Sequence, residues 1–99
     1  MKKIKFNGAF PEGEIREMEG YFFKIGEFDL VAHKRFDVKG WAVSELSTGW
    51  ALYKHSYKSR KTSIEAAGVL LSKDTAASCL AACILNTPAI NEITGGDLS

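Results

Sequence analysis

Residues 41–53 read WAVSELSTGWALY, two strand-like runs separated by the turn residues Ser47-Thr48-Gly49. Aromatic and β-branched residues suit strands, and a short turn containing glycine between two such runs is a good hairpin signal. We therefore predict strands over 41–46 and 50–53, joined by a tight turn. This hairpin indicates an antiparallel sheet in the first part of the chain.

Residue types divide the chain into two parts. All eleven aromatic residues lie at or before Tyr57, whereas Ala, Leu, Ile, Ser and Thr dominate the residues that follow. Alanine and leucine favour helices, and strands followed by helices favour an α+β domain over alternating βαβ units. A chain of 99 residues has room for one core. We predict one domain, in which an antiparallel β-sheet of three to five strands packs against two C-terminal α-helices: 1–57 mainly strands, 62–86 two helices, 87–99 a flexible tail.

Apolar residues also predict strands before the hairpin. Residues 2–6, 21–25 and 27–34 carry the aromatic, β-branched or alternating side chains that are typical of strands. Residues 9–20 differ, because they contain proline, two glycines and four glutamates. We predict an exposed acidic loop over 9–20.

Two helices are predicted after the sheet. Thr62-Ser63-Ile64-Glu65 has the capping-box form, with Thr62 as N-cap and Glu65 at N3, and predicts a helix to about Ser72. A second helix over 75–86 has Asp74 as its cap and ends before a proline.

The second predicted helix is apolar almost all round, since Ser78 is the one polar residue between Thr75 and Asn86. Such a helix is normally buried on most sides. Two arrangements are open. In the one that we favour, the helix lies between the sheet, the first helix and the tail. In the other, its surface forms a homodimer or a contact with a partner.

The formal net charge is +1, from 13 Lys and Arg against 12 Asp and Glu. This balance excludes a histone-like excess of positive charge, and the aromatic content excludes a fully disordered chain. No apolar run approaches the ~18 residues of a membrane span, and no secretory signal follows the basic start, so we expect a cytoplasmic protein. By segment, the net charge is −1 over 1–30, +5 over 31–61 and −3 over 62–99. A local basic surface therefore persists inside a nearly neutral total.

Motifs of common catalytic and cofactor sites are missing from the sequence. It contains no G-x-S-x-G elbow, no phosphate-binding glycine pattern and no C-x-x-C knuckle. Cys79 and Cys83 have i, i+4 spacing on one helix and are expected as free thiols of a reducing compartment. Asp29 and His33 are expected as a surface pair on one strand face rather than as an oriented base. We expect no enzyme activity, no metal site and no cofactor.

The basic segment is the strongest candidate for a binding site. Cations interleaved with aromatic rings suit a phosphate backbone with stacked bases, and the segment ends at a helix N-terminus, where backbone N–H groups favour anions. In the alternative interpretation, Trp41 and Trp50 belong to the core and the lysines only solubilise a sheet edge. The residues expected to bind a partner or nucleic acid are Lys34, Arg35, Lys54, His55, Tyr57, Lys58, Arg60 and Lys61. An alternative acidic contact consists of Glu12, Glu14, Glu17 and Glu19.

Residues 41–52, followed by Ser59-Arg60-Lys61 and a capped helix, resemble small proteins carried by phages and prophages. The resemblance covers about residues 27–72. Some small phage proteins inhibit host defence, anti-CRISPR proteins that bind a nuclease complex among them. The chain also resembles sheet-plus-helix DNA readers, such as AP2-like and integrase arm-binding domains, whose sheet enters the major groove. The strands of those domains are richer in arginine, whereas here the corresponding positions include the small residues Ala42, Ser44 and Ala51.

Two functions of different classes follow. The first is a small non-enzymatic phage or mobile-element protein that inhibits a host defence complex, CRISPR-type complexes included. It would act by contact with a host protein or protein–nucleic-acid complex. The second is a nucleic-acid-binding domain that uses the basic, aromatic edge of the sheet. Neither function involves a membrane.

Overall fold

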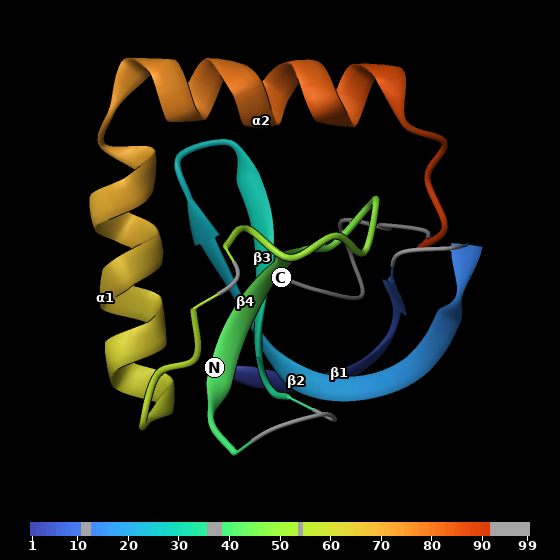
Figure 1. Ribbon diagram of the computed structural model, residues 1–99, viewed down its shortest axis with the longest axis vertical. Helices are drawn as coiled ribbons and strands as arrows, with labels where there is room; N and C mark the ends of the chain where they lie inside the picture. The colour runs from blue at the N-terminus through green and yellow to red at the C-terminus, as the bar shows by residue number, and fades with distance from the viewer. Residues whose placement is uncertain (11–12, 36–38, 54, 92–99) are drawn as a thin grey trace.

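The computed structural model describes residues 1–10, 13–35, 39–53 and 55–91. Four antiparallel strands, β1 (Lys2–Ala9), β2 (Ile15–Ile25), β3 (Phe28–Lys34) and β4 (Trp41–Glu45), form a sheet in the order β1-β2-β3-β4. Helices α1 (Arg60–Leu71) and α2 (Asp74–Asn86) follow the sheet (Figure 1). The predicted α+β class, an antiparallel sheet followed by two C-terminal helices, is confirmed.

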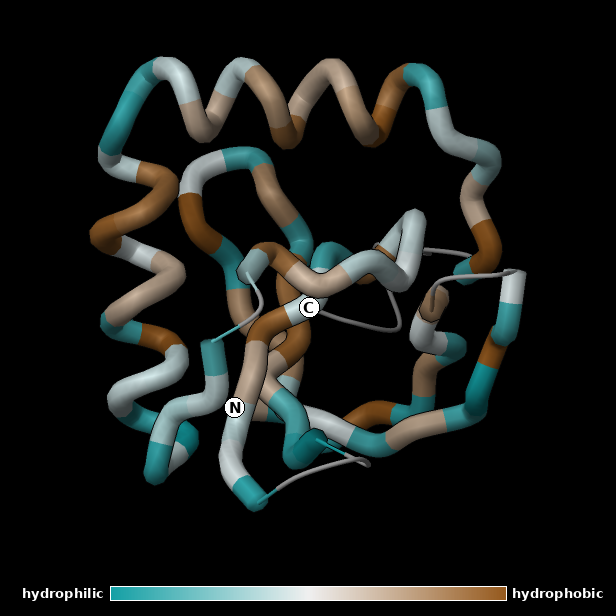
Figure 2. The backbone as a smooth tube through the Cα atoms, in the orientation of Figure 1, coloured by the Kyte–Doolittle hydropathy of each residue, from teal (hydrophilic) through white to brown (hydrophobic). Residues whose placement is uncertain are grey.

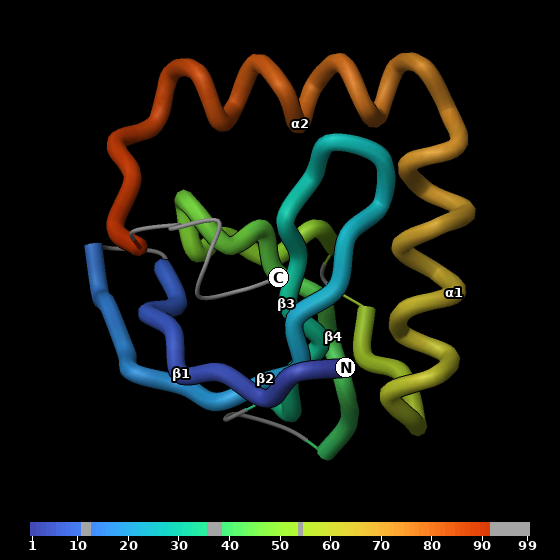
Figure 3. Tube along the Cα trace, turned by 180° about the vertical axis from the view of Figure 1, so that it is seen from behind, coloured from blue at the N-terminus to red at the C-terminus, as the bar shows by residue number. Residues whose placement is uncertain are grey.

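The sheet is strongly curved, because β1 and β2 bend away from β3 and β4 (Figures 1 and 3). Gly20 of β2 pairs with His33 of β3. A Cβ atom at this position would overlap Val31 Cγ1 and lie 2.7 Å from the Ala32 carbonyl oxygen. Glycine therefore allows the close approach of the two strands.

Two hydrophobic clusters lie on opposite faces of β3. Leu30 packs with Val43 and with Ala67 of α1 in the first cluster, and all three are fully buried. In the second cluster Val31 packs with Phe6, beneath the curved β1–β2 pair. Because neighbouring residues of a strand point to opposite faces, this arrangement covers β3 on both sides.

The acidic loop predicted over 9–20 is wrong for its second half. Strand β2 begins at Ile15 and pairs with β1, so Glu17 and Glu19 lie on a strand. β1 correspondingly continues to Ala9. Cross-strand pairing overrides the low strand propensity of glutamate, because propensity in sheets depends on the neighbours that a side chain meets.

The first strand and the turn of the predicted 41–53 hairpin are present, but its second strand is not. The chain reverses after β4, where the Glu45 N–H donates to the Trp50 carbonyl at 2.9 Å. In the returning segment, residues 50–57, the described residues pair with β4 at isolated bridges, Ala51 with Ser44 and Tyr57 with Trp41. This returning segment covers the outer edge of β4 without forming a regular strand.

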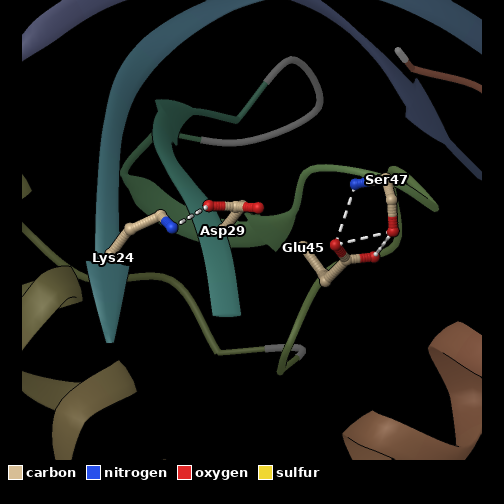
Figure 4. A network of polar contacts seen from close by, with 4 residues as sticks. All are labelled: Lys24, Asp29, Glu45 and Ser47. Carbon is tan, nitrogen blue, oxygen red and sulfur yellow. Dashed lines mark hydrogen bonds and ion pairs between the residues drawn. The ribbon is translucent and has the colours of Figure 1, made fainter. Parts of the chain in front are cut away.

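The turn after β4 is built around the buried carboxylate of Glu45 (Figure 4). Its oxygens accept hydrogen bonds from the Ser47 N–H and hydroxyl at 2.8 Å and from the Thr48 N–H at 2.9 Å. Such bonds to a carboxylate are stronger than bonds between neutral groups and compensate for its burial. Figure 4 also shows Lys24, whose Nζ lies 3.4 Å from Asp29 Oδ1. That oxygen has no hydrogen-bond partner of good geometry among the described residues, so the ammonium acts as its counter-charge.

Helix α1 begins three residues earlier than predicted. Its N-cap is Ser59, whose hydroxyl accepts the Thr62 N–H at 3.2 Å, while the Thr62 hydroxyl accepts the Ser59 N–H at 3.2 Å. Thr62 thus occupies the N3 place expected for Glu65, and the prediction of Thr62 as N-cap is wrong. From this start the helix directs Ser63 and Ala67 into the core, where both are fully buried.

Helix α2 crosses the end of the molecule near the β2–β3 turn, bent by 97° from α1 (Figures 1 and 3). The favoured prediction that it lies buried is wrong, because no residue of α2 is buried within the described chain. Apolar residues occur around the helix (Figure 2), and Leu85 is 85% exposed. Its N-cap is Lys73, not Asp74 as predicted. No single described helix is long and apolar enough to cross a membrane, and only the bent pair α1 and α2 passes that test together.

Within the predicted tail 87–99, Ile90 and Asn91 are hydrogen-bonded to β1 or to the turn after β4, and residues 92–99 lie outside the described part of the chain. Asn91 Oδ1 accepts the Asn7 N–H at 2.7 Å, and Asn91 Nδ2 donates to the Asn7 carbonyl at 2.8 Å. The same amide nitrogen lies 2.6 Å from the Leu46 carbonyl. One side chain therefore covers part of the edge of β1 and anchors the chain beyond α2.

Candidate functional site

An open hollow of about 670 Å³ lies at the end of the sheet where β3 ends and β4 begins. Among the described residues, its lining combines four cationic side chains with two aromatic rings and contains no acidic residue, while Asp37 in the β3–β4 connection lies outside the described part of the chain. These residues come from three segments that are separate in sequence. They are Lys34, Arg35, Lys39, Gly40, Trp41, Ser56, Tyr57 and Lys58.

Backbone hydrogen bonds hold the three segments together. The Arg35 N–H donates to the Gly40 carbonyl at 3.0 Å and closes the connection between β3 and β4. Trp41 and Tyr57 exchange N–H···O bonds of 2.7 and 2.9 Å, which fix the returning segment against the first residue of β4. These backbone hydrogen bonds thus fix the positions of the three segments that line the hollow.

Gly40 is required where the returning segment crosses the β3–β4 connection. Its φ of 134° lies in the region that side chains rarely adopt, and a Cβ atom there would overlap Ser56 Oγ. The Ser56 hydroxyl donates to the Lys39 carbonyl at 2.9 Å and fastens the crossing. Glycine at this point therefore sets how close the two walls of the hollow lie.

Cations and aromatic rings alternate beside the hollow. Lys34 Nζ lies 6.0 Å from the centroid of the Trp41 ring, and that ring lies 6.2 Å from the Tyr21 ring. Arg60 Cζ lies 4.1 Å from the centroid of Tyr21. Cation–π contacts act within about 6 Å. The rings position the positive charges of Lys34 and Arg60 without supplying the negative charge of an ion pair.

Tyr57 is connected to α1 through a second ring. The Tyr53 and Tyr57 centroids lie 5.2 Å apart in an edge-to-face arrangement, and the Tyr53 hydroxyl donates to the Ser63 carbonyl at 2.9 Å. Burial, with Tyr57 nearby, raises the pKa of Tyr53, so the hydroxyl stays a donor. On the other side, His55 meets the Tyr57 ring edge-on at 4.6 Å.

The structure brings only some residues of the predicted basic site together in the hollow. Four of its members line the hollow: Lys34, Arg35, Tyr57 and Lys58. Two contact rings beside it, His55 the Tyr57 ring and Arg60 the Tyr21 ring, whereas Lys61 is exposed in the first turn of α1 and is not among the lining residues. Lys54 lies outside the described residues.

The prediction omitted four lining residues: Lys39, Gly40, Trp41 and Ser56. A signal existed for Lys39, because it contributes to the +5 charge of residues 31–61. The alternative that both tryptophans belong to the core is wrong, because Trp41 is half-buried and Trp50 is 39% exposed.

Ion pairs involve two of the four glutamates of the predicted acidic contact. Two of its glutamates lie close to cations, Glu14 to Arg16 at 2.7 Å and Glu19 to Lys3 at 3.3 Å. Glu17 is exposed on β2, and Glu12 lies outside the described residues. Each cation offsets the field of its carboxylate beyond short range, so the described part of this surface presents little net negative charge.

His33 and Ser44 have the geometry of a base and a nucleophile but not the access. His33 Nε2 lies 2.7 Å from Ser44 Oγ, and Nδ1 lies 3.2 Å from the Lys34 carbonyl, which can only accept. Both side chains are buried, at 5% and 3% exposure. Burial lowers the pKa of His33, the bond to the Lys34 carbonyl opposes this shift, and nearby Arg35 adds to it. The predicted surface pair of His33 with Asp29 is therefore wrong, and His33 with Ser44 is a polar pair inside the core.

Within the described ranges, no three His, Cys, Asp or Glu side chains gather to hold a metal ion. Cys79 is exposed and Cys83 half-buried, and both are free thiols. The Cys83 sulfur lies 3.7 Å from the Thr87 hydroxyl.

No protein-family model, curated protein or solved structure matches this chain. The resemblance to small phage proteins and to sheet-based DNA readers stays a prediction.

Proposed function

We propose that this protein binds nucleic acid, without catalysis, through the basic hollow between the ends of β3 and β4. The observation that carries the proposal is the gathering of four cations and two aromatic rings from three separate segments, with no carboxylate among the described lining residues. Lysine and arginine attract phosphates. Aromatic rings offer stacking surfaces that accept any base.

Charge in the first turn of α1 supports an anionic ligand. Arg60 and Lys61 open the helix, and that turn contains no acidic residue. A helix N-terminus carries partial positive charge, so cations there are unfavourable and an anion is favourable. A bound phosphate would relieve this unfavourable placement. The positive charge beside the hollow thus opposes local helix stability while it favours anion binding.

The near neutrality of the whole chain is compatible with such a site. Residues 31–61 carry +5, and the rest of the chain carries −1 and −3, which is −4. At physiological ionic strength the screening length is about 8 Å. Negative charges on remote parts of the molecule therefore weaken the attraction at the hollow only slightly, while they suppress non-specific coating of nucleic acid.

The proposal is tested by fluorescence anisotropy with a labelled single strand of about 15 nucleotides and with its duplex. We expect binding at about 50 mM salt and weaker binding at about 200 mM. The double substitution Lys39→Gln, Lys58→Gln should weaken binding. The matched control Lys5→Gln, Lys73→Gln removes the same charge from residues outside the lining and should have less effect. Absence of binding by both nucleic acids at the lower salt would refute the proposal.

A second candidate function is inhibition of a host defence complex by protein contact. It is favoured by exposed apolar side chains on the two helices, since Leu85 is 85% and Val69 64% exposed. Leu85 belongs to α2, none of whose residues is buried within the described chain, and an apolar helix surface that stays exposed often marks a protein contact. The surface of α2 that carries Leu85 would also form the predicted homodimer. The acidic contact predicted from Glu12, Glu14, Glu17 and Glu19 would be a second surface for a partner protein.

This second function is tested by phage plaque counts on bacteria with active CRISPR-type immunity. The expressed chain should restore plaque formation, and Leu85→Glu should abolish the effect while Lys39→Gln does not. Plaque counts that the wild-type chain leaves unchanged would contradict it for the immune system tested. Sedimentation of the wild type and Leu85→Glu decides the homodimer, because a dimer should dissociate when a charge enters its contact.

A further inference from the structure

The basic hollow has a lining and a shape that suit unpaired bases. We propose, as an extension that rests on the proposed function, that it binds single-stranded rather than duplex nucleic acid. An unpaired base would lie against the rings of Trp41 and Tyr57, with adjacent phosphates near Lys39 and Lys58.

The first argument is the presence of aromatic rings among the cations. Trp41 and Tyr57 line the hollow and are half-buried. Lys34 and Tyr21 already lie against the Trp41 ring, and Tyr53 and His55 against the Tyr57 ring, so a base would stack on the part of each ring that faces the hollow. A duplex presents phosphates, sugars and base edges to a protein, while its base faces are stacked inside. Only unpaired bases can use an aromatic ring as a stacking surface. Cations alone would have sufficed for a duplex backbone.

The second argument is shape. Proteins that read duplex DNA insert a helix or a two-stranded ribbon into a major groove about 12 Å wide. Here the cations line an open, concave space of about 670 Å³ and come from three segments instead of projecting from one element. That volume lies within the range of about 300–1,000 Å³ that holds small organic ligands. A base with its sugar and phosphate can enter such a hollow, whereas a duplex can only rest on the rim.

The third argument is the placement of charge next to the rings. Lys34 lies over Trp41 at 6.0 Å, and Arg60 lies over Tyr21, which neighbours Trp41. Single-strand sites combine a positive groove that follows the backbone with aromatic side chains, and cations add to the stacking. The cations and rings that alternate beside this hollow are the same kinds of side chain that form such single-strand sites.

The test uses the Trp50→Phe protein, in which Trp41 is the one remaining tryptophan. Its fluorescence is titrated at about 50 mM salt with three ligands of equal length. These are a single-stranded oligothymidylate, the same backbone without bases, and a duplex. We expect the oligothymidylate to quench Trp41 and to bind about 5- to 150-fold more tightly than the abasic strand, the effect of stacking one base. The duplex should also bind more weakly than the oligothymidylate.

The outcomes separate this inference from the proposed function. If no ligand binds, the proposed function fails. If the abasic strand or the duplex binds as tightly as the oligothymidylate, nucleic-acid binding stands and the single-strand inference is overturned.

A pair of substitutions tests the rings directly. Tyr57→Leu should weaken binding of oligothymidylate while binding of the abasic strand is retained, which also shows that the variant is folded. Trp50→Leu is the control, because Trp50 is not among the lining residues, and it should alter neither affinity. Equal oligothymidylate affinity in Tyr57→Leu and wild type would count against the stacking of a base on Tyr57.

Discussion

The Ser44→Ala substitution removes one buried oxygen atom and leaves His33 Nε2 without the hydroxyl that lies 2.7 Å away. The two side chains are 3% and 5% exposed, so water has little access to replace the lost partner. An unsatisfied buried polar group costs about 1–3 kcal/mol. For a domain of this size each 1 kcal/mol shifts Tm by roughly 4–8 °C. We therefore expect Tm to fall by roughly 4–24 °C.

The pH dependence of stability provides an independent measure of the same pair. Burial lowers the pKa of His33 in the folded state below its ordinary value of 6.5. Between the two values the unfolded state binds a proton that the folded state does not. The stabilisation is fully present above about pH 6.5 and is lost as the pH falls toward the folded-state pKa, by up to about 1.4 kcal/mol per pH unit.

Urea denaturation at about pH 8 and about pH 5 measures both effects. The samples are wild type, Ser44→Ala, His33→Gln and the control Ser78→Ala, whose serine is exposed on α2. Ser44→Ala should lose stability relative to the control, and His33→Gln should show a smaller loss on acidification than the wild type. If Ser44→Ala is as stable as the control and His33→Gln keeps the wild-type pH dependence, the reasoning about the buried pair is refuted.

Three further predictions concern the hollow and the sheet edge. Removing the charges of Lys39 and Lys58 should reduce the steepness of log affinity against log salt concentration for a single strand by about 1.4, because each lost phosphate contact accounts for about 0.7. Anisotropy titrations that return the wild-type slope would exclude these contacts. Gly40→Ala, at a φ of 134° and with no space for a methyl group, should lower the free energy of unfolding by about 1–3 kcal/mol in urea, and a variant of undiminished stability would contradict the described crossing. Asn91→Ala removes the side-chain partner of the Asn7 amide, so stability should fall by about 1–3 kcal/mol; hydrogen exchange at that amide should accelerate, and an unchanged rate would argue against the bond.

Much of the fold could be predicted because it depends on local features. The turn after β4 was recognisable from Ser47-Thr48-Gly49, and the helices from their alanine and leucine content, although both predicted N-caps, Thr62 and Asp74, are wrong. The cap of α1 shows the limit, since Ser59 and Thr62 both have side chains that can cap a helix. Burial of Ser63 and Ala67 distinguishes the two starts, and that burial requires the sheet. The strand content of 15–20 was likewise hidden, because it depends on pairing with β1.

The candidate site also combines residues that local sequence could predict with residues whose position depends on tertiary contacts. Lys34, Arg35 and Lys58 could be predicted from the concentration of positive charge in one segment. Trp41 could not be placed beside them, because its position depends on the backbone bonds that it exchanges with Tyr57. Those bonds join residues on different segments, and no pattern within either segment encodes them.

By itself, the sequence determined the order of sheet and helices and the segregation of charge, because propensity and periodicity act between near neighbours. Only the tertiary structure decided that His33 lies buried beside Ser44 instead of at the surface. It also decided that no residue of α2 is buried within the described chain and that cations from three segments line one hollow with Trp41 and Tyr57. The physical reason is that burial and convergence depend on contacts between residues far apart in the chain. The resulting basic hollow is the property on which the proposed function depends.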